Sequence, residues 1–332
     1  MTSTSDAPLL VVDGLRTTFR LPSGREADAV ADVSFSLRRG ETLGLVGESG
    51  SGKSVTALSL IGLIQPPGRI TAGRVLFEGQ DLRLLTDAAL RPIRGRRIGF
   101  VFQEPMVALN PVFTIGQQIV ETLEVHGLAR GRAARAGAID WLRAARIPSP
   151  EVRVDHYPHQ LSGGLRQRAM IALALCAEPS LLIADEPTTA LDVTVQAEIL
   201  DLLRDLRGEF GLSLLLITHD LGVVAEMADH VAVMYGGRLV ESGTTRDLFS
   251  GPAHPYTRGL LACLPGGSFG TRLTAIPGTV PPLGQFPSGC PFATRCPDRL
   301  PHCDQALAAV TSVGDTHSVA CHLYGSTKGT SQ

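Results

Sequence analysis

Lysine is nearly absent from this chain of 332 residues. Two of its 30 Lys and Arg residues are Lys, at positions 53 and 328, which leaves 28 Arg. Because this protein uses Arg wherever any positive charge would serve, a lysine inside a motif carries more weight than usual. An excess of positive charge is also missing, since the formal net charge is −2. General affinity for nucleic acid is therefore not indicated.

Long apolar runs are missing as well. The longest, such as residues 169–177, have about half the length that a membrane-spanning helix needs. Residues 1–8 are polar and lack the basic and apolar regions of a signal peptide. We therefore expect a cytoplasmic protein whose membrane role depends on partners. With 44% apolar residues, the chain can bury a large core and is expected to form more than one domain.

Residues 47–54, with the sequence GESGSGKS, match the phosphate-binding pattern GxxxxGK[ST]. They follow a strand-like run, residues 41–46, and precede a helix-like run that starts at Val55. A phosphate-binding loop requires this context, because the helix directs its positive end toward the phosphates. The alternative is a flexible Gly/Ser loop, which the flanking strand and helix make less favourable.

The residue types in this loop suit the binding of a phosphate group. Gly47, Gly50 and Gly52 keep side chains away from backbone N–H groups that must pack around phosphate oxygens. Ser49 and Ser51 of the same loop are also predicted to bind the nucleotide. The loop then ends in the two residues with chemical roles. Lys53 would reach the β- and γ-phosphates, and the Ser54 hydroxyl would be a Mg²⁺ ligand.

Polar residues follow three strand-like runs of the sequence. Residues 181–184 lead into Asp185 and Glu186, where Asp185 would hold Mg²⁺ through water and Glu186 would be the general base. Gln103, after residues 98–102, could contact Mg²⁺ or the attacking water, and His219, after residues 212–217, could contact the γ-phosphate. The alternatives are that the acidic residues cap a helix and that the His and Gln are structural.

Two further positions are candidates for nucleotide binding. Ser162, Gly163 and Gly164 precede an apolar helix, residues 168–177, and could form a second anion site; an ordinary N-cap is the alternative. Phe19 lies at the end of the first strand-like run, residues 9–20, and could stack on an adenine ring or belong to the core. Residues 9–20 and 29–37 are predicted to form an antiparallel pair.

In its order of motifs, the chain resembles ATP-binding-cassette (ABC) ATPases over roughly residues 9–245. The resemblance rests on the phosphate loop, Gln103, residues 161–167, Asp185-Glu186, residues 190–192 and His219. Within that family it is similar to the subunits that energise oligopeptide and dipeptide permeases. The markers are residues 103–106 (QEPM), 109–111 (LNP), 157–160 (YPHQ) and 254–257 (HPYT).

The resemblance implies an α/β fold with a RecA-like core, an antiparallel β subdomain and an inserted helical subdomain at about 106–178. The ATPase domain would span residues 1–250 and a Cys-containing extension residues 251–332. Each ATP would lie between the phosphate loop of one chain and the Ser162-Gly163-Gly164 helix start of a second, identical or homologous ATPase, with Asp192 at that interface. The implied partners are two membrane permease subunits and an extracytoplasmic solute-binding protein, which would place the chain at the cytoplasmic face of the membrane.

The segment after residue 250 differs in composition. Residues 251–289 contain seven Pro and eight Gly, which predicts an extended linker. Four cysteines then follow with the spacing C-x₅-C-x₆-C-x₁₇-C: Cys290, Cys296, Cys303 and Cys321. A metal could stabilise so short and Pro-rich a tail, and structural zinc, disulfides or unrelated buried thiols are the alternatives. Resemblance to permease ATPases whose tails carry such a cluster favours [4Fe–4S] over Zn²⁺.

Other functions compete with ATP-driven import of peptides or similar solutes. A soluble ABC ATPase in DNA repair or translation is the main alternative, disfavoured by the single cassette, the permease-type tail and the lack of basic excess. A P-loop kinase would lack residues 161–167. The identity of the solute stays open between peptides, nickel chelates and other small solutes, because the ATPase does not touch it.

Overall fold

The computed structural model describes residues 7–264 and 276–325 and divides into two compact units. The described part of the first unit comprises residues 7–9, 37–42 and 81–217. The second comprises residues 10–36, 43–80 and 218–325, apart from the gap at 265–275. The second unit thus contains both the phosphate loop and the C-terminal extension. The domain boundary near residue 250 stays a prediction.

The first unit contains three parallel strands in the order β8-β7-β6: β6 (Ile98–Val101), β7 (Leu181–Asp185) and β8 (Ser213–Thr218, whose last residue is counted with the second unit). Every residue of β7 and β8 is buried. Such strands are covered on both faces, which is why they appear in the sequence as unbroken apolar runs. The three predicted strands are confirmed, and the side chains that follow them come from the carboxyl ends of the strands.

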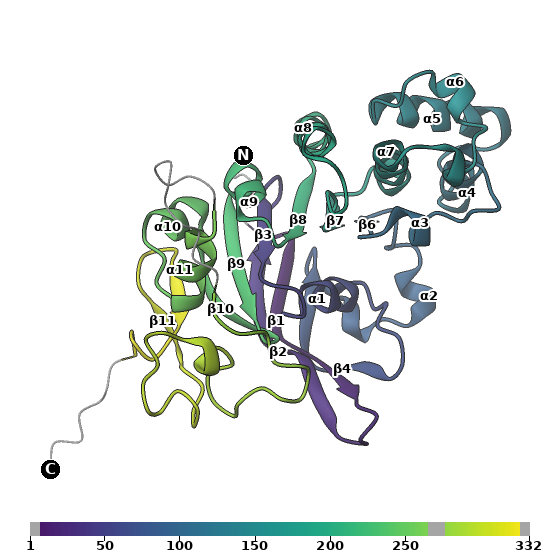
Figure 1. Cartoon of the computed structure of the whole chain (residues 1–332). Coiled ribbons are helices and arrows are strands. Elements are labelled where there is room, and N and C mark those ends of the chain that lie inside the picture. Colours follow the sequence, from purple (N-terminus) through teal and green to yellow (C-terminus); the bar gives the residue numbers. More distant parts are fainter. Residues whose placement is uncertain (1–6, 265–275, 326–332) are drawn as a thin grey trace, which may run out of the picture. The chain divides into compact units, whose positions relative to one another are not determined.

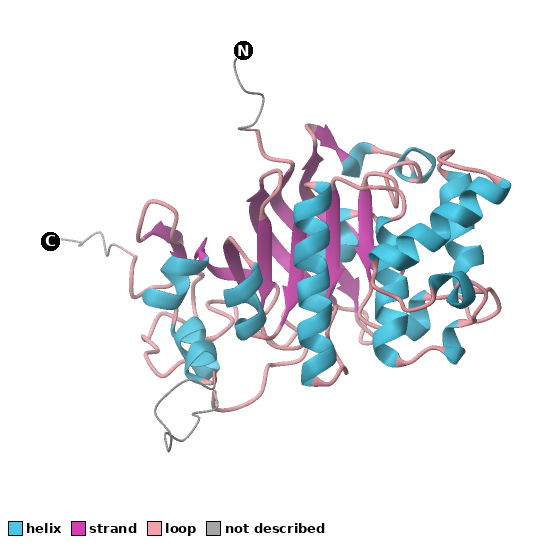
Figure 2. Ribbon diagram, turned by 90° about the horizontal axis from the view of Figure 1, so that it is seen from above, coloured by secondary structure: helices cyan, strands magenta, loops and turns pink. Residues whose placement is uncertain are grey.

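Helices make up most of the rest of the first unit, and α4, α5, α6 and α7 gather in one group (Figures 1 and 2). Thr114 begins this group with a capping box, since its hydroxyl accepts from Gln117 N and the Gln117 side chain accepts from Thr114 N. Helices therefore form within the predicted insertion, and its existence as a separate subdomain stays a prediction. The helices of the unit are η1 (Leu82–Leu84), α2 (Asp87–Leu90), α3 (Pro105–Ala108), α4 (Ile115–Val125), α5 (Gly131–Ala144), α6 (Pro150–Arg153), η2 (Pro158–Gln160), α7 (Gly163–Leu175) and α8 (Val193–Phe210).

The second unit contains most of a sheet in the order β2-β1-β4-β5. Its strands are β1 (Leu10–Arg20), β2 (Glu26–Leu37), β4 (Gly68–Phe77) and β5 (Gln80–Asp81), which ends at the first residue of the other unit. The strands β1 and β2 are neighbours, and in the turn between them Gly24 N donates to Leu21 O over 2.9 Å. β1 also pairs antiparallel with β4, from Leu10 opposite Phe77 to Phe19 opposite Gly68.

A second group of strands in this unit carries the phosphate loop. β3 (Thr42–Val46) runs parallel to β9 (His230–Tyr235), and β9 pairs antiparallel with β10 (Arg238–Thr244). The C-terminal extension continues this order with β12 (Ser318–Ala320) on β10 and β11 (Val310–Ser312) on β12. The helices here are α1 (Lys53–Leu60), α9 (Leu221–Met227) and α10 (Thr245–Ser250).

The predicted extended linker at 251–289 is partly wrong, because it contains helix α11 (Pro255–Ala262). Pro255 occupies the first turn, where it has no hydrogen bond to lose, and the His254 side chain accepts from Tyr256 N. Tyr256 is fully buried, so tertiary packing outweighs the Pro and Gly content. Residues 265–275 of the predicted linker lie outside the described residues. A short turn, η3 (Ala293–Arg295), follows.

Candidate nucleotide-binding site

The phosphate loop lies between β3 and α1, as its motif predicts, and its lysine is held inside the loop. Lys53 is 4% exposed, and its Nζ donates to Gly47 O at 2.6 Å and to Glu48 O at 3.0 Å. Ser51 N also donates to Glu48 O, at 3.2 Å. The loop is therefore folded around the ammonium group, and the role of this compact positive charge toward a phosphate stays a prediction.

The glycines of the loop serve different needs. A Cβ on Gly47 would lie 2.2 Å from Met234 O, and one on Gly52 would lie 2.4 Å from Ala29 O, with a φ of +101° at Gly52. Both positions therefore require glycine for close backbone approach. Gly50 has open space around it, and its φ of +79° is the left-handed conformation that favours glycine.

Glu48, inside the loop, has partners from far along the chain that the sequence did not reveal. Its N–H donates to the Tyr256 hydroxyl over 2.8 Å, and its carboxylate accepts from both terminal nitrogens of Arg295, at 2.5 and 3.1 Å. Tyr256 lies in the HPYT marker, which identified the region but not this contact. No sequence signal pointed to Arg295, one of 28 Arg.

In the first unit, the structure brings Gln103 and Glu186 together. Gln103 Nε2 donates to Glu186 Oε2 over 3.2 Å, and the Thr189 hydroxyl donates to the same oxygen over 2.8 Å. Glu186 has a φ of +47°, a conformation that non-glycine residues rarely adopt and that concentrates at functional sites. Asp185, at the end of β7, is 5% exposed. The half-buried Glu186 carboxylate is thus oriented by the Gln103 amide and the Thr189 hydroxyl. It directly follows the buried Asp185 in the chain.

The second predicted anion site lies at the start of α7. Ser162 is its N-cap and its hydroxyl accepts from Leu165 N at 3.4 Å, so the ordinary capping role is present. The two glycines differ: a Cβ on Gly164 would lie 2.7 Å from Val195 Cγ1, whereas a Cβ on Gly163 would meet only Leu191 Cδ2, at 3.7 Å. Packing within this chain therefore explains Gly164 but not Gly163. Asp192 is exposed and caps α8 through Val195 N.

His219 and Phe19, the two remaining candidates in the second unit, have local contacts that do not test whether they bind a nucleotide. His219 is exposed and precedes α9, whose N-cap is Asp220. Phe19 is half-buried, and its ring lies over Gly68 of β4, where a Cβ would be 2.6 Å away. Their roles toward ATP stay predictions.

The described structure does not support the predicted metal centre. Burial raises the pKa of the Cys290 thiol to about 11, and the other three cysteines of the motif contribute, so the four share one neighbourhood. However, no group of three or more His, Cys, Asp or Glu side chains in residues 7–264 and 276–325 is arranged to hold a metal ion. Cys290, Cys296 and Cys303 pack with one apolar cluster and Cys321 with another, and all four are free thiols. Apolar packing places these side chains, and neither [4Fe–4S] nor Zn²⁺ has a preformed ligand set there.

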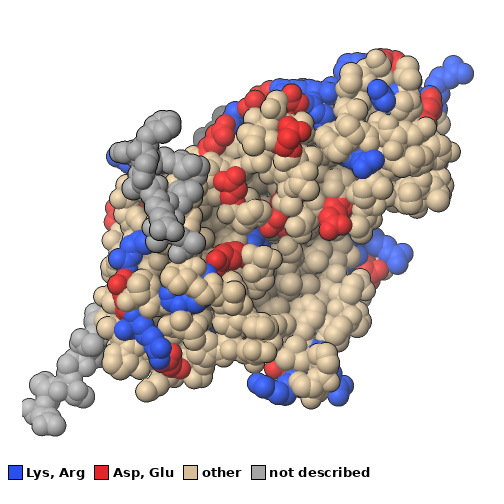
Figure 3. Space-filling model, viewed as in Figure 1, with Lys and Arg blue, Asp and Glu red and all other residues tan. Residues whose placement is uncertain are grey.

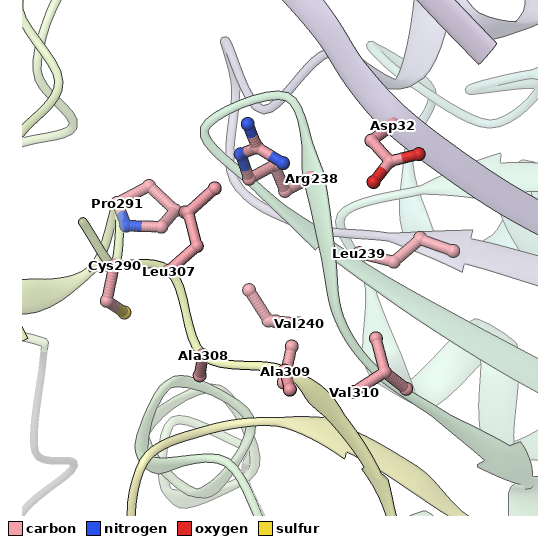
Figure 4. Close-up of a pocket in the computed structure, with 11 residues that line it drawn as sticks. Asp32, Arg238, Leu239, Val240, Cys290, Pro291, Leu307, Ala308, Ala309 and Val310 are labelled. Atoms are coloured by element: carbon pink, nitrogen blue, oxygen red, sulfur yellow. The ribbon is translucent and has the colours of Figure 1, made fainter. Parts of the chain in front are cut away.

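A cavity of about 220 Å³ lies beside Cys290 (Figure 4). Asp32 and Arg238 lie on one side of it, and the tail residues Ala308, Ala309 and Val310 on the opposite side. Burial lowers the pKa of Arg238, because charge is disfavoured away from water. The residues predicted to bind nucleotide are not among those that line this cavity.

On the face shown in Figure 3, Lys and Arg side chains are interspersed with Asp and Glu, without a broad basic patch. Within the described ranges, no helix is long and apolar enough to cross a membrane. Several large apolar side chains near Gln103 are nevertheless exposed: Phe102, Met106, Val107, Val112 and Phe113.

Comparison with known proteins connects both parts of the chain to one family. The family model described as ABC transporter matches residues 30–189, and the model described as oligopeptide/dipeptide transporter, C-terminal region, matches residues 240–303. The dipeptide transport ATP-binding protein of Bacillus subtilis is 50% identical, with 95% of this chain and 94% of that protein covered. A putative peptide import ATP-binding protein of Brucella abortus is also 50% identical, with 96% and 97% covered.

A solved structure supports the same assignment. An ATP-binding cassette in a dimeric, post-hydrolysis state bound to ADP and Pi is 29% identical and has a TM-score of 0.64, with 71% of this chain and 99% of that chain covered. The expected ABC cassette fold is thereby confirmed, and with it an ATP-hydrolysing family. The chain therefore belongs to the ATP-binding proteins of the ABC transporter family, in the branch that carries the oligopeptide/dipeptide transporter C-terminal region.

Proposed function

We propose that this chain is the ATP-hydrolysing subunit of an importer for peptides or similar small solutes. The observation that carries the proposal is the 50% identity to relatives named for dipeptide and peptide import, which extends over nearly their whole length. A soluble role in DNA repair or translation finds no support, because two family models match this chain: the ABC transporter model and the model of the oligopeptide/dipeptide transporter C-terminal region. The test is solute uptake by the chain reconstituted with its permease subunits and binding protein, compared across dipeptides, longer peptides and metal chelates.

In this proposal, Lys53 and the loop N–H groups bind the ATP phosphates, while Ser54, Gln103 and Asp185 hold Mg²⁺. The metal would neutralise phosphate charge and orient the γ-phosphate for attack. The buried ammonium of Lys53 and the closely packed glycines support the binding role. Phe19 is assigned to the adenine and His219 to the γ-phosphate.

Glu186 is proposed as the general base that takes a proton from the attacking water. Its orientation by Gln103 and Thr189 supports the role, since a base must be held within reach of the proton it removes. Glu186→Gln keeps the shape but cannot accept a proton, so turnover should fall by about 10²–10⁴-fold while MgATP still binds. Glu209→Gln, on an exposed position of α8, is the control. More than about a tenth of wild-type turnover in Glu186→Gln would exclude Glu186 as the base.

A second ATPase subunit, identical or homologous, is proposed to close over the bound ATP with its Ser162-Gly163-Gly164 helix start, and Asp192 is placed at that interface. Two observations support this. Gly163 is exposed at a helix N-terminus, and its surroundings in this chain leave room for a side chain. The similar solved cassette is a dimer with ADP and Pi.

The exposed apolar side chains from Phe102 to Phe113 are proposed to contact one of the two membrane permease subunits, and the chain would then lie at the cytoplasmic face of the membrane. Exposed apolar residues in such a group are typical of interaction surfaces. An extracytoplasmic solute-binding protein would deliver the solute. Replacing Val107, which is 79% exposed, by Asp should abolish co-purification with the permease in detergent and leave ATP binding unchanged.

The metal centre at Cys290, Cys296, Cys303 and Cys321 is kept as a separate proposal that rests on spacing and resemblance alone. Its test is anaerobic purification with metal analysis. About four irons per chain and an absorbance that disappears in Cys303→Ser would support [4Fe–4S]. One zinc without colour would identify Zn²⁺, and no metal would leave the thiols as packing residues.

A further inference from the structure

The phosphate loop contains a negative charge at a position where a negative charge is unfavourable. Glu48 lies directly after Gly47, in a loop whose N–H groups are proposed to surround a triphosphate. A free carboxylate there would repel the phosphates. Its charge must therefore be neutralised, or its side chain held away from the ligand, if the loop is to bind ATP well.

Arg295 supplies that neutralisation. Its Nη1 donates to Glu48 Oε2 at 2.5 Å and its Nη2 to Glu48 Oε1 at 3.1 Å, which is a two-pronged ion pair. The Arg295 side chain is 4% exposed and that of Glu48 is 29% exposed. An ion pair this buried is screened little by solvent.

The position of Arg295 is itself defined by contacts on several sides. Its Nε donates to Pro277 O at 2.9 Å and its Nη1 to the Tyr235 hydroxyl at 3.3 Å. The guanidinium carbon also lies 5.8 Å from the centre of the Tyr235 ring. Because Tyr235 ends β9 and Pro277 belongs to the extension, this arginine is held by both the sheet and the tail.

Tyr256 fixes the backbone of the same loop residue. Its hydroxyl accepts from Glu48 N at 2.8 Å, and its ring packs edge-on against Tyr235 with 4.7 Å between ring centres. Burial raises the pKa of this hydroxyl, so it stays protonated at all physiological pH values. Glu48 O in turn accepts from Lys53 Nζ, which links these contacts to the lysine of the loop.

We propose that Arg295 and Tyr256 are positioning residues for ATP, through which the C-terminal extension holds the phosphate loop in its binding conformation and neutralises Glu48. This deepens the proposed function and rests on it. Arg295 lies between Cys290 and Cys296, so a change that displaces this segment would also displace the arginine that pairs with Glu48. The extension then contributes to nucleotide affinity.

The experiment measures Kd for MgATP and MgADP by titration calorimetry on the full chain. Arg295→Met should weaken MgATP binding by about tenfold or more, since it leaves Glu48 unpaired beside the phosphates. MgADP, with less negative charge, should be affected less. In the double variant Glu48→Gln/Arg295→Met the repulsive carboxylate is gone, so MgATP affinity should return to within about threefold of wild type.

Arg258→Met is the matched control, because Arg258 forms an exposed ion pair with Asp298 in the same unit. Its Kd should stay within about twofold of wild type. Tyr256→Phe, which removes only the hydroxyl, should weaken MgATP binding by about threefold or more, and it decides the matter if Arg295→Met does not fold.

The outcomes separate the two levels of the proposal. Failure of the wild-type chain to bind MgATP would refute the proposed function. If the wild type binds MgATP and the folded variants Arg295→Met and Tyr256→Phe have the same Kd, the positioning role is overturned and the proposed function is not. A double variant no better than Arg295→Met, or equal losses for MgATP and MgADP, would mean that the ion pair is only structural.

Discussion

Acid should destabilise the second unit through His254, the N-cap of α11. This residue is 1% exposed, and burial, with a smaller contribution from Arg258, lowers the pKa of its side chain to about 3. The neutral ring is also required by the hydrogen bond that Tyr256 N donates to Nδ1 over 3.1 Å. The His254 Nε2 atom is buried without a hydrogen-bond partner among the described residues. A protonated ring would therefore be strongly disfavoured here.

The direction of the pH effect on stability follows from the different pKa values of His254 in the folded and unfolded states. An unfolded histidine titrates near 6.5, so between pH 6.5 and 3 the unfolded chain binds a proton that the folded chain does not. The contribution of His254 to the free energy of unfolding is thus retained above pH 6.5 and declines as the pH falls. Between pH 7 and pH 5 the decline amounts to about 2 kcal/mol.

The measurement is urea unfolding followed by circular dichroism at pH 7 and pH 5, for the wild type and His254→Asn. Asparagine is a good N-cap and does not titrate, so the variant should lose about 2 kcal/mol less than the wild type over this range. His159→Asn, at an exposed position, is the control and should follow the wild type. Equal losses in wild type and His254→Asn would refute the reasoning, as would a His254 proton resonance that titrates near pH 6.5.

Three further outcomes are expected. Gly52→Ala should weaken ATP binding by at least about tenfold, because its Cβ would lie 2.4 Å from Ala29 O, whereas Gly208→Ala, with open space around its Cβ, should not; calorimetric Kd values compare them. Gly163→Asp should block ATPase turnover and leave the mutant's own phosphate loop able to bind ATP; in mixing experiments, loss of nucleotide binding in the mutant's own loop with dimer closure unaffected would contradict the proposed dimer. Thr114→Ala should lower the free energy of unfolding by about 1 kcal/mol, through loss of the capping box that begins α4.

Local chemistry makes much of the site predictable from sequence. A phosphate loop needs glycines, a lysine and a hydroxyl at fixed spacing between a strand and a helix, so the order of residues 47–54 is enough to recognise it. The strands β6, β7 and β8 are recognisable for a similar reason, since strands buried on both faces appear as short apolar runs. The ends of those runs then indicate Gln103, Asp185 and Glu186.

The tertiary structure decided what depends on residues far apart in the chain. Glu48 is 208 residues from Tyr256 and 247 from Arg295, and nothing in the local pattern of an Arg-rich sequence indicates which arginine pairs with it. Helix α11 forms in a Pro- and Gly-rich segment because burial of Tyr256 outweighs local propensity. Cysteine spacing predicted a metal site, and only the tertiary structure shows that the four neighbouring thiols pack against apolar side chains, Cys290, Cys296 and Cys303 in one cluster and Cys321 in another. Gly163 and Gly164 are identical in sequence terms, and only the position of Val195 beside one of them shows which glycine the fold itself requires.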